Sequence, residues 1–445
     1  MKILFISLGC DKNLADSEEM LGLLTGSGHE IVDSEEEAEA IVINTCCFIH
    51  DAKEESVNTI LEMAEYKKTG KCKALVVTGC MAQRYKEEIT QEIPEVDAVL
   101  GTTSYGDIVK ALNEVQAGHV FQEFRDINEL PEDSGRRVLT TGGHFGYLKI
   151  AEGCDKHCTY CIIPSLRGSF RSVPEERLLA QAEYMASQGV KELILVAQET
   201  TVYGTDLYGR KTLHILLKKL CQIRGIRWIR VLYCYPEEIY DELIQVMKEE
   251  KKICNYLDLP IQHASDRILK RMGRRTTRKQ LTDIITKLRR EIPDIVLRTS
   301  LITGFPGETQ EDHEELMEFV DEMEFDRLGV FTYSPEEGTP AETMEGQVSE
   351  EVKEERRDEI MSLQQEISLE KGNERIGQEL LVMIEGKVSG ESAYIGRTYA
   401  DAPKVDGYLF VQTGELLVTG DFAHVRVTGA LEYDLIGELA DEYTE

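Results

Sequence analysis

Short apolar segments alternate with helix-forming segments along most of this 445-residue chain, and this alternation limits the possible folds more than any other feature. Before residue 125, the segments predicted to be strands are Lys2–Ser7, Ala40–Asn44, Ala74–Thr78 and Asp97–Leu100. The helix-forming segments between them are Ser17–Thr25, Ala52–Tyr66 and Gln83–Ile93. Such alternation is typical of a parallel sheet covered by helices. We therefore expect an N-terminal domain with an open parallel α/β sheet over residues 1–125.

A second series of the same kind follows a predicted linker at residues 126–143, which ends in Thr140-Thr141-Gly142-Gly143. The strands expected in residues 144–372 are Leu148–Ala151, Glu192–Val196, Trp228–Leu232, Tyr256–Leu259, Val296–Leu301 and Leu328–Thr332. The clearest helices between them are Glu175–Gln188 and Gln310–Glu322. Six strands in βα repeats predict a full or partial barrel with its chemistry at the carboxyl ends of the strands.

The last part of the chain changes character. An amphipathic helix is expected over residues 349–371, and Gly372 is expected to end it. Beyond it, short apolar segments separated by glycines predict a small antiparallel β-barrel over residues 376–441. These segments are Leu380–Ile384, Ala393–Arg397, Tyr408–Gln412 and His424–Val427. Residues 376–445 carry 13 acidic and 4 basic side chains, so this module is itself acidic.

Composition excludes several classes of protein. No apolar run approaches the roughly 18–20 residues that a membrane span needs, so we expect a cytoplasmic protein without membrane contact. Eleven cysteines is an odd number in a long chain, which argues against a disulfide framework and favours metal or redox use. The net charge of −32 favours a basic partner, because nucleic-acid binders usually need basic surfaces to neutralise phosphates.

The strongest local signal is the array Cys154-x3-Cys158-x2-Cys161, placed just after a predicted strand. Closely spaced thiolates bind iron–sulfur clusters. Three ligands would leave one iron of a four-iron cluster open to another molecule. The alternative is a zinc site with His157 as the fourth ligand, but structural zinc sites usually combine two short ligand pairs and no second pair follows.

Three further cysteines, Cys10, Cys46 and Cys80, each follow a predicted strand of the N-terminal sheet. The carboxyl ends of parallel strands share one edge of a sheet, which makes a second metal site plausible. Spacings of 36 and 34 residues are a weak signal alone, since buried free cysteine often acts as a small hydrophobe. The residues themselves leave both interpretations open.

The sequence segments around these cysteines resemble those of the methylthiotransferase family of radical SAM enzymes, and the resemblance extends over nearly the whole chain. The matching segments are Ser7-Leu8-Gly9-Cys10-Asp11-Lys12-Asn13, Asn44-Thr45-Cys46, Thr78-Gly79-Cys80-Met81-Ala82-Gln83-Arg84 and the Cys154 array. The C-terminal module resembles the family's TRAM domain. The resemblance implies two 4Fe–4S clusters, one held by Cys10, Cys46 and Cys80 and one, which binds S-adenosylmethionine, by Cys154, Cys158 and Cys161.

Four other site residues follow from the same resemblance. Tyr160, next to the third cysteine of the array, is expected to shield its cluster. Gln198 and Glu199 follow the second barrel strand, where the superfamily contacts the amino group of S-adenosylmethionine. Arg298, on a later strand, is expected to pair with its carboxylate. Cys47, Cys72, Cys221, Cys234 and Cys254 match no ligand and are expected to be structural.

The family has a branch that modifies an adenosine of tRNA and a branch that modifies an aspartate of small-subunit ribosomal protein S-twelve. Asp11-Lys12-Asn13 stands where the tRNA branch typically has Gln-Met-Asn, and Glu336-Glu337 stands where that branch tends to have Arg-Pro. Gly396-Arg397-Thr398, with Asp401 and Asp406, resembles the ribosomal-protein form of the TRAM module. The acidity of this module suits a basic protein and would repel RNA.

The reaction implied by this resemblance consumes two molecules of S-adenosylmethionine. One methylates sulfur carried on the N-terminal cluster, and the other gives a radical that removes hydrogen from the β-carbon of the target aspartate. A low-potential electron donor such as flavodoxin or ferredoxin and a source of sulfide or polysulfide are implied as partners. No stable tRNA binding is expected. The alternatives are the tRNA adenosine enzyme and a non-catalytic iron–sulfur protein, which would have complete cysteine ligation.

Overall fold

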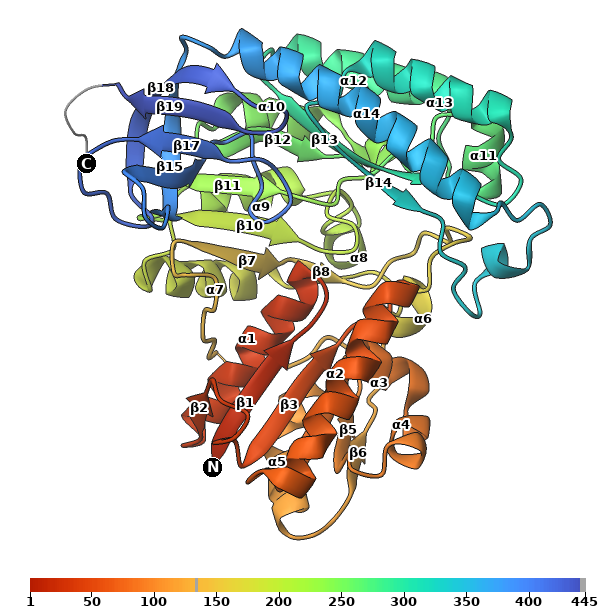
Figure 1. Ribbon diagram of the computed structural model, residues 1–445, viewed down its shortest axis with the longest axis vertical. Helices are drawn as coiled ribbons and strands as arrows, with labels where there is room; N and C mark the ends of the chain where they lie inside the picture. The colour runs from red at the N-terminus through yellow and green to blue at the C-terminus, as the bar shows by residue number, and fades with distance from the viewer. Residues whose placement is uncertain (133–134, 441–445) are drawn as a thin grey trace.

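The computed structural model describes residues 1–132 and 135–440, which form three parts in chain order (Figure 1). Residues 133–134 of the predicted linker and residue 441 of the predicted C-terminal module lie outside the described residues. The first part is an α/β domain, the second a larger α/β domain with a parallel sheet, and the third a closed β-barrel. The predicted fold class is confirmed.

The N-terminal sheet is parallel throughout, with strand order β2-β1-β3-β4-β5-β6. Every residue of β3 and β4 is buried, as in the continuous apolar strands of sheets covered on both faces. The two edge strands β2 and β6 were missed because each has only three residues, none of them buried. The strands are β1 (Lys2–Ser7), β2 (Glu30–Val32), β3 (Ala40–Thr45), β4 (Ala74–Gly79), β5 (Ala98–Leu100) and β6 (Phe121–Glu123).

The helices of this domain differ from expectation in two places. The first begins at Asp11, directly after Cys10, instead of at Ser17. The helix expected over Gln83–Ile93 is split into two short helices at Lys86, which has a φ of 44°. The helices are α1 (Asp11–Gly26), α2 (His50–Thr69), α3 (Cys80–Tyr85), α4 (Glu87–Glu92) and α5 (Ile108–Gln116), with a 3-10 turn at Tyr105–Asp107.

The central sheet is also parallel and has the order β14-β13-β12-β11-β10-β7, so each strand lies beside its neighbour in sequence. It does not close on itself, which agrees with the partial barrel expected. Its strands are β7 (Phe145–Lys149), β10 (Glu192–Val196), β11 (Trp228–Val231), β12 (Ile253–Asp258), β13 (Val296–Thr303) and β14 (Arg327–Thr332). A short antiparallel ribbon joins β8 (Ala151–Glu152) to β9 (Arg171–Ser172).

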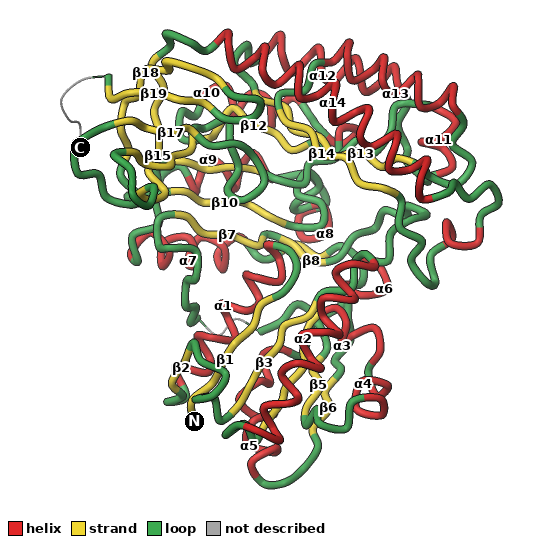
Figure 2. The backbone as a smooth tube through the Cα atoms, viewed as in Figure 1, coloured by secondary structure: helices red, strands yellow, loops and turns green. Residues whose placement is uncertain are grey.

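Helices cover the outer face of this sheet, where most of the largest apolar cluster lies (Figure 2). Both α12 and α13 begin with a capping box, in which a threonine and the third residue of the helix bond each other's backbone N–H groups. The helices are α6 (Ile163–Arg167), α7 (Glu175–Ser187), α8 (Thr205–Tyr208), α9 (Leu213–Leu220), α10 (Asp241–Glu249), α11 (Asp266–Arg271), α12 (Arg278–Glu291) and α13 (Gln310–Met323), with a 3-10 turn at Pro236–Glu238 and another at Pro340–Thr343.

The long helix α14 (Glu350–Glu374) crosses the molecule and leads into the barrel (Figure 1). The prediction that Gly372 ends this helix was wrong, because the helix continues through it. A Cβ at Gly372 would lie 3.0 Å from the Cβ of Ala430 on β18, so this glycine permits close packing of the helix against the barrel.

The barrel has the strand order β15-β16-β17-β19-β18. Its pairs are antiparallel apart from β17 and β19, which run parallel, so the expected antiparallel barrel holds with one exception. The fifth strand, β19, was not expected. The strands are β15 (Glu379–Lys387), β16 (Ala393–Arg397), β17 (Leu409–Gln412), β18 (Phe422–Ala430) and β19 (Leu435–Leu439).

A buried ion network fixes the barrel to the central sheet. Glu192, the first residue of β10, contacts Arg230 of β11 at 2.8 Å and Arg397 of the barrel at 2.7 Å, and all three side chains are fully buried. Around it, Trp228 of β11 packs edge-on against Phe422 of β18, with ring centroids 4.8 Å apart. The barrel is therefore docked through charged and aromatic groups contributed by both parts.

Among the residues that the structure describes, no helix combines the length and apolar character needed to cross a bilayer.

We predict that Glu192→Gln weakens the docking of the barrel, because Arg230 and Arg397 lose their shared buried anion. Breaking a buried ion pair costs about 3–5 kcal/mol of unfolding free energy. Trp228 is the only tryptophan of the chain, so its fluorescence in urea reports this interface directly. The control is Lys191→Gln, whose partly exposed ammonium lies 3.6 Å from Asp421 of the barrel and should contribute about 1 kcal/mol or less. Equal effects of the two variants would contradict the prediction.

Candidate functional site

The three N-terminal cysteines lie at the carboxyl ends of three adjacent strands. Cys10 follows β1, Cys46 follows β3 and Cys80 begins α3 directly after β4. Cys46 and Cys80 are buried, whereas Cys10 is exposed. Burial and the neighbouring Cys80 and Cys10 thiols raise the pKa of Cys46 to about 12. The structure thus brings these thiols close enough to influence one another's charge, and their role as ligands of one cluster stays a prediction.

Glycine allows the first of these loops to approach the second. Gly9 has a φ of +86°, and a Cβ at this position would lie 2.6 Å from the Cβ of Cys46 and 2.9 Å from its sulfur. No side chain fits there without moving the cysteine. The backbone before Cys10 is therefore packed directly against Cys46.

Asn13 connects the loops that carry these cysteines. Its side-chain amide donates to the carbonyl of Leu8 at 3.1 Å and to the carbonyl of Thr45 at 2.9 Å. The amide of Asn44 in turn donates to the Asn13 carbonyl at 2.9 Å. The Asn13 carbonyl oxygen of the side chain lies 3.8 Å from the sulfur of Cys80. Asn13, the last residue of the Asp11-Lys12-Asn13 motif, thus helps to hold together the loops of the cysteine site.

Lys12 of the same motif contacts the central domain. Its ammonium is buried and lies 3.3 Å from the ring centroid of Tyr233, which follows β11 and has a φ of 59°. This is a cation–π contact across the boundary of the two domains. Lys12, which stands where the tRNA branch typically has methionine, therefore contributes to the domain interface.

The second cysteine array forms the loop between β8 and α6. The backbone N–H of Cys154 donates to the carbonyl of Gly168 at 3.1 Å, and the N–H of Cys161 donates to the carbonyl of Cys158 at 3.0 Å. Burial raises the pKa of Cys154 to about 11 and that of Cys161 to about 12, and the charges of the other thiols add to both shifts. These two raised pKa values favour the protonated thiols of Cys154 and Cys161, so metal binding there would release protons.

Neither trio has the geometry of a site for one ion. Within residues 1–132 and 135–440, no group of three His, Cys, Asp or Glu side chains lies close enough to bind a single metal ion. A cluster of four irons and four sulfides is larger than one ion, so its ligands stand further apart. The donor set fits such a cluster, since each trio consists of thiols alone.

Tyr160 lies where it was expected, beside the array. Its ring packs edge-on against Phe305, with centroids 6.4 Å apart, and Phe305 packs in the same way against Tyr333 at 5.4 Å. Burial and the nearby Cys158 thiol raise the pKa of the Tyr160 hydroxyl well above its ordinary value. These aromatic rings form an apolar wall on one side of the cysteine loop, and shielding by Tyr160 stays a prediction.

Gln198 and Glu199 follow β10. Lys156, which belongs to the cysteine loop, connects this loop to Glu199. The Lys156 ammonium is ion-paired with Glu238 and lies 3.9 Å from Glu199, whose other oxygen accepts a hydrogen bond from Thr201 at 3.1 Å. The buried carbonyl oxygen of Gln198 has no hydrogen-bond partner among the described residues. An unsatisfied acceptor beside a carboxylate fits a cationic donor such as an ammonium group.

Arg298 is placed differently from the other predicted residues. Its guanidinium contacts Asp258 at 2.8 Å and Asp406 of the barrel at 3.4 Å. It therefore helps to dock the barrel in this structure, and its proposed contact with the carboxylate of S-adenosylmethionine remains a prediction.

Arg274 is a residue that sequence reasoning missed. It is 6% exposed, its guanidinium lies 4.4 Å from the ring centroid of Tyr235, and it donates to the carbonyl of Pro260 at 3.1 Å. Two of its nitrogens, Nε and one terminal nitrogen, have no hydrogen-bond partner among the described residues. Nothing in the sequence marks it, because it lies in an ordinary basic turn, Arg274-Arg275-Thr276, remote from both arrays.

The acidic residues that suggested a basic partner are partly used inside the molecule. Glu336 is 3% exposed and lies 3.4 Å from Arg84, four residues after Cys80. Asp401 of the barrel is buried and ion-paired with Arg327. Glu337 is the most exposed of these three, with a side chain that is 72% exposed, although its carboxylate lies 3.8 Å from Arg84.

Comparisons with known proteins agree with this architecture. Residues 2–101 match "Uncharacterized protein family UPF0004", residues 148–320 match the radical SAM superfamily and residues 376–440 match the TRAM domain. A protein of Lachnoclostridium phytofermentans named ribosomal protein uS12 methylthiotransferase RimO is 64% identical over 98% of this chain and 99% of its own length. Proteins of the same name from Clostridium botulinum and Acetivibrio thermocellus are each 50% identical, over 100% and 99% of this chain and 99% of their own lengths.

The chain belongs to the RimO methylthiotransferase family. Its match to the radical SAM superfamily supports an iron–sulfur cluster and S-adenosylmethionine as cofactors. The predicted recognition of this family is confirmed, and so is its ribosomal-protein branch, since these relatives are all named for uS12.

Solved structures support the fold alone. The radical S-adenosylmethionine methyltransferase TsrM of Kitasatospora setae, with cobalamin and a 4Fe-4S cluster bound, superposes with a TM-score of 0.56 at 13% identity over 77% of each chain. The cobalamin-dependent radical enzyme OxsB, with aqua-cobalamin and S-adenosylmethionine bound, gives 0.51 at 14% identity over 82% of this chain and 56% of its own.

We predict a pH dependence of stability that arises from Glu199. Burial raises the pKa of Glu199 from 4.5 to about 7, although the positive charge of Lys156 acts in the opposite direction. The folded state thus favours the protonated carboxyl, so the stability that this group adds is complete below its unfolded pKa and is lost as pH rises through 7. Relative to Glu199→Gln, the unfolding free energy of the cluster-free protein should fall by about 1.4 kcal/mol per pH unit between roughly pH 5 and 7, and then level off.

Urea unfolding of both proteins at several pH values measures this difference. Parallel pH curves for the wild type and Glu199→Gln would show that the carboxyl titrates at its ordinary value, and the prediction would fail.

Proposed function

We propose that this protein is a radical SAM methylthiotransferase that adds a methylthio group to the β-carbon of an aspartate of ribosomal protein uS12. The observation that carries the proposal is identity of 64% over 98% of the chain to a relative with this named activity, combined with two cysteine trios, one after three strands of the N-terminal sheet and one in the loop between β8 and α6. The methylthio group replaces one hydrogen of the aspartate side chain. An unactivated C–H bond has no acidic proton, so an acid–base mechanism would not suffice.

The six predicted cysteines would hold two 4Fe–4S clusters, Cys10, Cys46 and Cys80 one and Cys154, Cys158 and Cys161 the other. When bound, the clusters and S-adenosylmethionine supply the hydrogen-abstracting radical and the activated sulfur. The glycine-rich turns and the Asn13 hydrogen bonds fix the N-terminal thiols before any iron arrives. The protein's own part is to hold these groups and exclude water.

The residues around the Cys154 array are suited to orienting S-adenosylmethionine. Gln198 offers an acceptor that has no donor in the described part of the chain, and Glu199 offers a carboxylate, so both can bind its amino group. The aromatic rings of Tyr160, Phe305 and Tyr333 exclude water on one side. These roles, like that of Arg298 toward the carboxylate, rest on the family resemblance and on these contacts.

The partners follow from the reaction. The substrate uS12 is the target that relatives are named for, and the net charge of −32 is complementary to a basic ribosomal protein. A low-potential donor such as flavodoxin or ferredoxin would supply electrons, and sulfide or polysulfide would supply sulfur. A substrate of this kind places the enzyme in the cytoplasm.

The decisive test is anaerobic reconstitution with iron and sulfide, followed by reductant, S-adenosylmethionine and a peptide from the target loop of uS12. We expect a product that is heavier by one methylthio group in place of one hydrogen, measured by mass spectrometry. We also expect about eight irons per chain, since each cluster contains four. Modification of tRNA instead of the peptide would move the protein to the other branch of the family.

Separate variants distinguish the two trios. Cys158→Ala should abolish cleavage of S-adenosylmethionine to 5′-deoxyadenosine while the N-terminal site keeps about four irons. Cys46→Ala should abolish methylthio transfer while 5′-deoxyadenosine is still formed. The matched control is Cys47→Ala, which removes a fully buried thiol next to Cys46 that matches no ligand and should keep the iron of both sites. Loss of both clusters in either ligand variant would contradict independent sites.

A further inference from the structure

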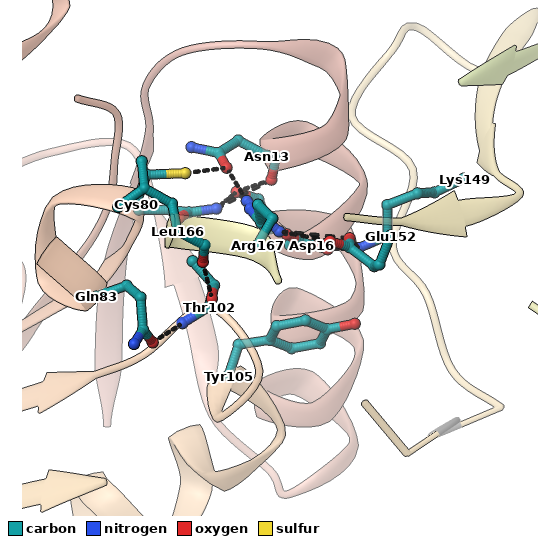
Figure 3. A network of polar contacts seen from close by, with 12 residues as sticks. Asn13, Asp16, Cys80, Gln83, Thr102, Tyr105, Lys149, Glu152, Leu166 and Arg167 are labelled. Carbon is teal, nitrogen blue, oxygen red and sulfur yellow. Dashed lines mark hydrogen bonds and ion pairs between the residues drawn. The ribbon is translucent and has the colours of Figure 1, made fainter. Parts of the chain in front are cut away.

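A buried network of four charged side chains lies beside Asn13 and Cys80 of the N-terminal cysteine site (Figure 3). Arg167 donates to Asp16 at 2.8 Å and lies 3.4 Å from Glu152. Lys149 is ion-paired with both Asp16 and Glu152. The four side chains are between 3% and 9% exposed. Two cations face two anions, so the network is balanced in charge.

Each member lies close in sequence to a cysteine of one trio. Asp16 is in α1, the helix that begins directly after Cys10, whereas Glu152 in β8 is two residues before Cys154. Arg167 is the last residue of α6, the helix that follows Cys161. In the same region α1 contacts β7, and α3, which begins with Cys80, contacts α6. The network therefore connects the segments that carry both sites.

Arg167 is the member that reaches furthest into the N-terminal site. Its second terminal nitrogen donates to the side-chain oxygen of Asn13, the residue that joins the loops before Cys10 and Cys46. The same oxygen lies 3.8 Å from the Cys80 sulfur. One side chain thus contacts the frame of the N-terminal site and the ribbon before Cys154.

We propose that Arg167 is a positioning residue that holds the N-terminal cysteine site in a fixed place opposite the Cys154 array and stabilises negative charge on the N-terminal cluster. The proposal rests on the proposed function, in which the methylthio group and the radical must meet at one substrate carbon. A planar guanidinium with several fixed donors can bond Asn13 and Asp16 together, which an ammonium cannot do with the same geometry. A small displacement between reacting groups is costly, because reaction requires near-contact alignment.

The first measurement compares the two products of the reconstituted holoenzyme. For Arg167→Gln we expect 5′-deoxyadenosine formation to stay within about twofold of the wild type while methylthiolation of the uS12 peptide falls by about tenfold to a hundredfold, the usual range for supporting residues of metal sites. S-adenosylmethionine is then cleaved without transfer. An unchanged ratio of the two products would overturn the proposal.

The matched control is Arg84→Gln. Like Arg167, Arg84 lies a few residues after a cysteine of one trio, here Cys80, and its side chain is only 9% exposed. It also joins the two domains, through Glu336, but no contact with the Arg167 network is found among the described residues. We expect its ratio of products to remain that of the wild type. An equal loss of coupling in Arg84→Gln would show that any loosening of the interface suffices, and the specific role of Arg167 would be refuted.

The second measurement is the reduction potential of the N-terminal cluster, taken in a background with Cys154, Cys158 and Cys161 all changed to alanine. Loss of a nearby positive charge disfavours the reduced, more negative cluster, so Arg167→Gln should shift the potential to a more negative value. Arg167→Lys keeps the charge and should restore the potential while leaving methylthio transfer impaired. A potential that is the same in all three proteins would contradict the electrostatic part of the proposal.

Two outcomes separate this proposal from others. If Arg167→Gln binds less iron than the wild type, Asp16→Asn is the second variant, and it should show the same excess of 5′-deoxyadenosine over methylthio product. If the wild-type enzyme does not modify the uS12 peptide at all, the proposed function fails, while the shift in potential still decides whether Arg167 acts on the N-terminal cluster.

Discussion

The direction of parallel strands determines where the chemistry of this protein can occur. In a parallel sheet all carboxyl ends lie at one edge, so residues that follow adjacent strands are brought together without any further device. Cys10, Cys46 and Cys80 follow β1, β3 and β4, which are neighbours in the N-terminal sheet. The Cys154 array is built differently, because its three cysteines lie in a single loop between β8 and α6. The N-terminal site therefore depends on backbone hydrogen bonds between strands, which involve none of its cysteine side chains.

Charged residues at the interfaces then fix the three parts relative to one another. The network of Asp16, Lys149, Glu152 and Arg167 lies between the first two parts, and that of Glu192, Arg230 and Arg397 lies between the second and third. Buried ion pairs contribute little net stability, because desolvation offsets their attraction, but they strongly disfavour arrangements that leave a charge unpaired. Such contacts therefore specify one relative position of the domains, and they add little to the stability of that arrangement.

Much of this fold could be predicted from the sequence. The strands Lys2–Ser7 and Glu192–Val196 were placed without error because each has a continuous apolar run that begins after a charged first residue. Short edge strands such as Glu30–Val32 gave no periodic signal, and Gly372 was misread because its packing partner, Ala430, is distant in sequence. The six cysteines were proposed as ligands from motifs, whereas their charged neighbours gave no signal in the sequence. Lys149 lies in a predicted strand, and only the folded chain reveals that its partner Asp16 comes from the N-terminal domain.

The exposure of Cys10 sets it apart from the other five proposed ligands, which are buried or half-buried. Small solutes such as sulfide and dioxygen reach an exposed position before a buried one. In the proposed function, the N-terminal cluster would therefore be both the easier one to supply with sulfur and the first one that oxidants attack.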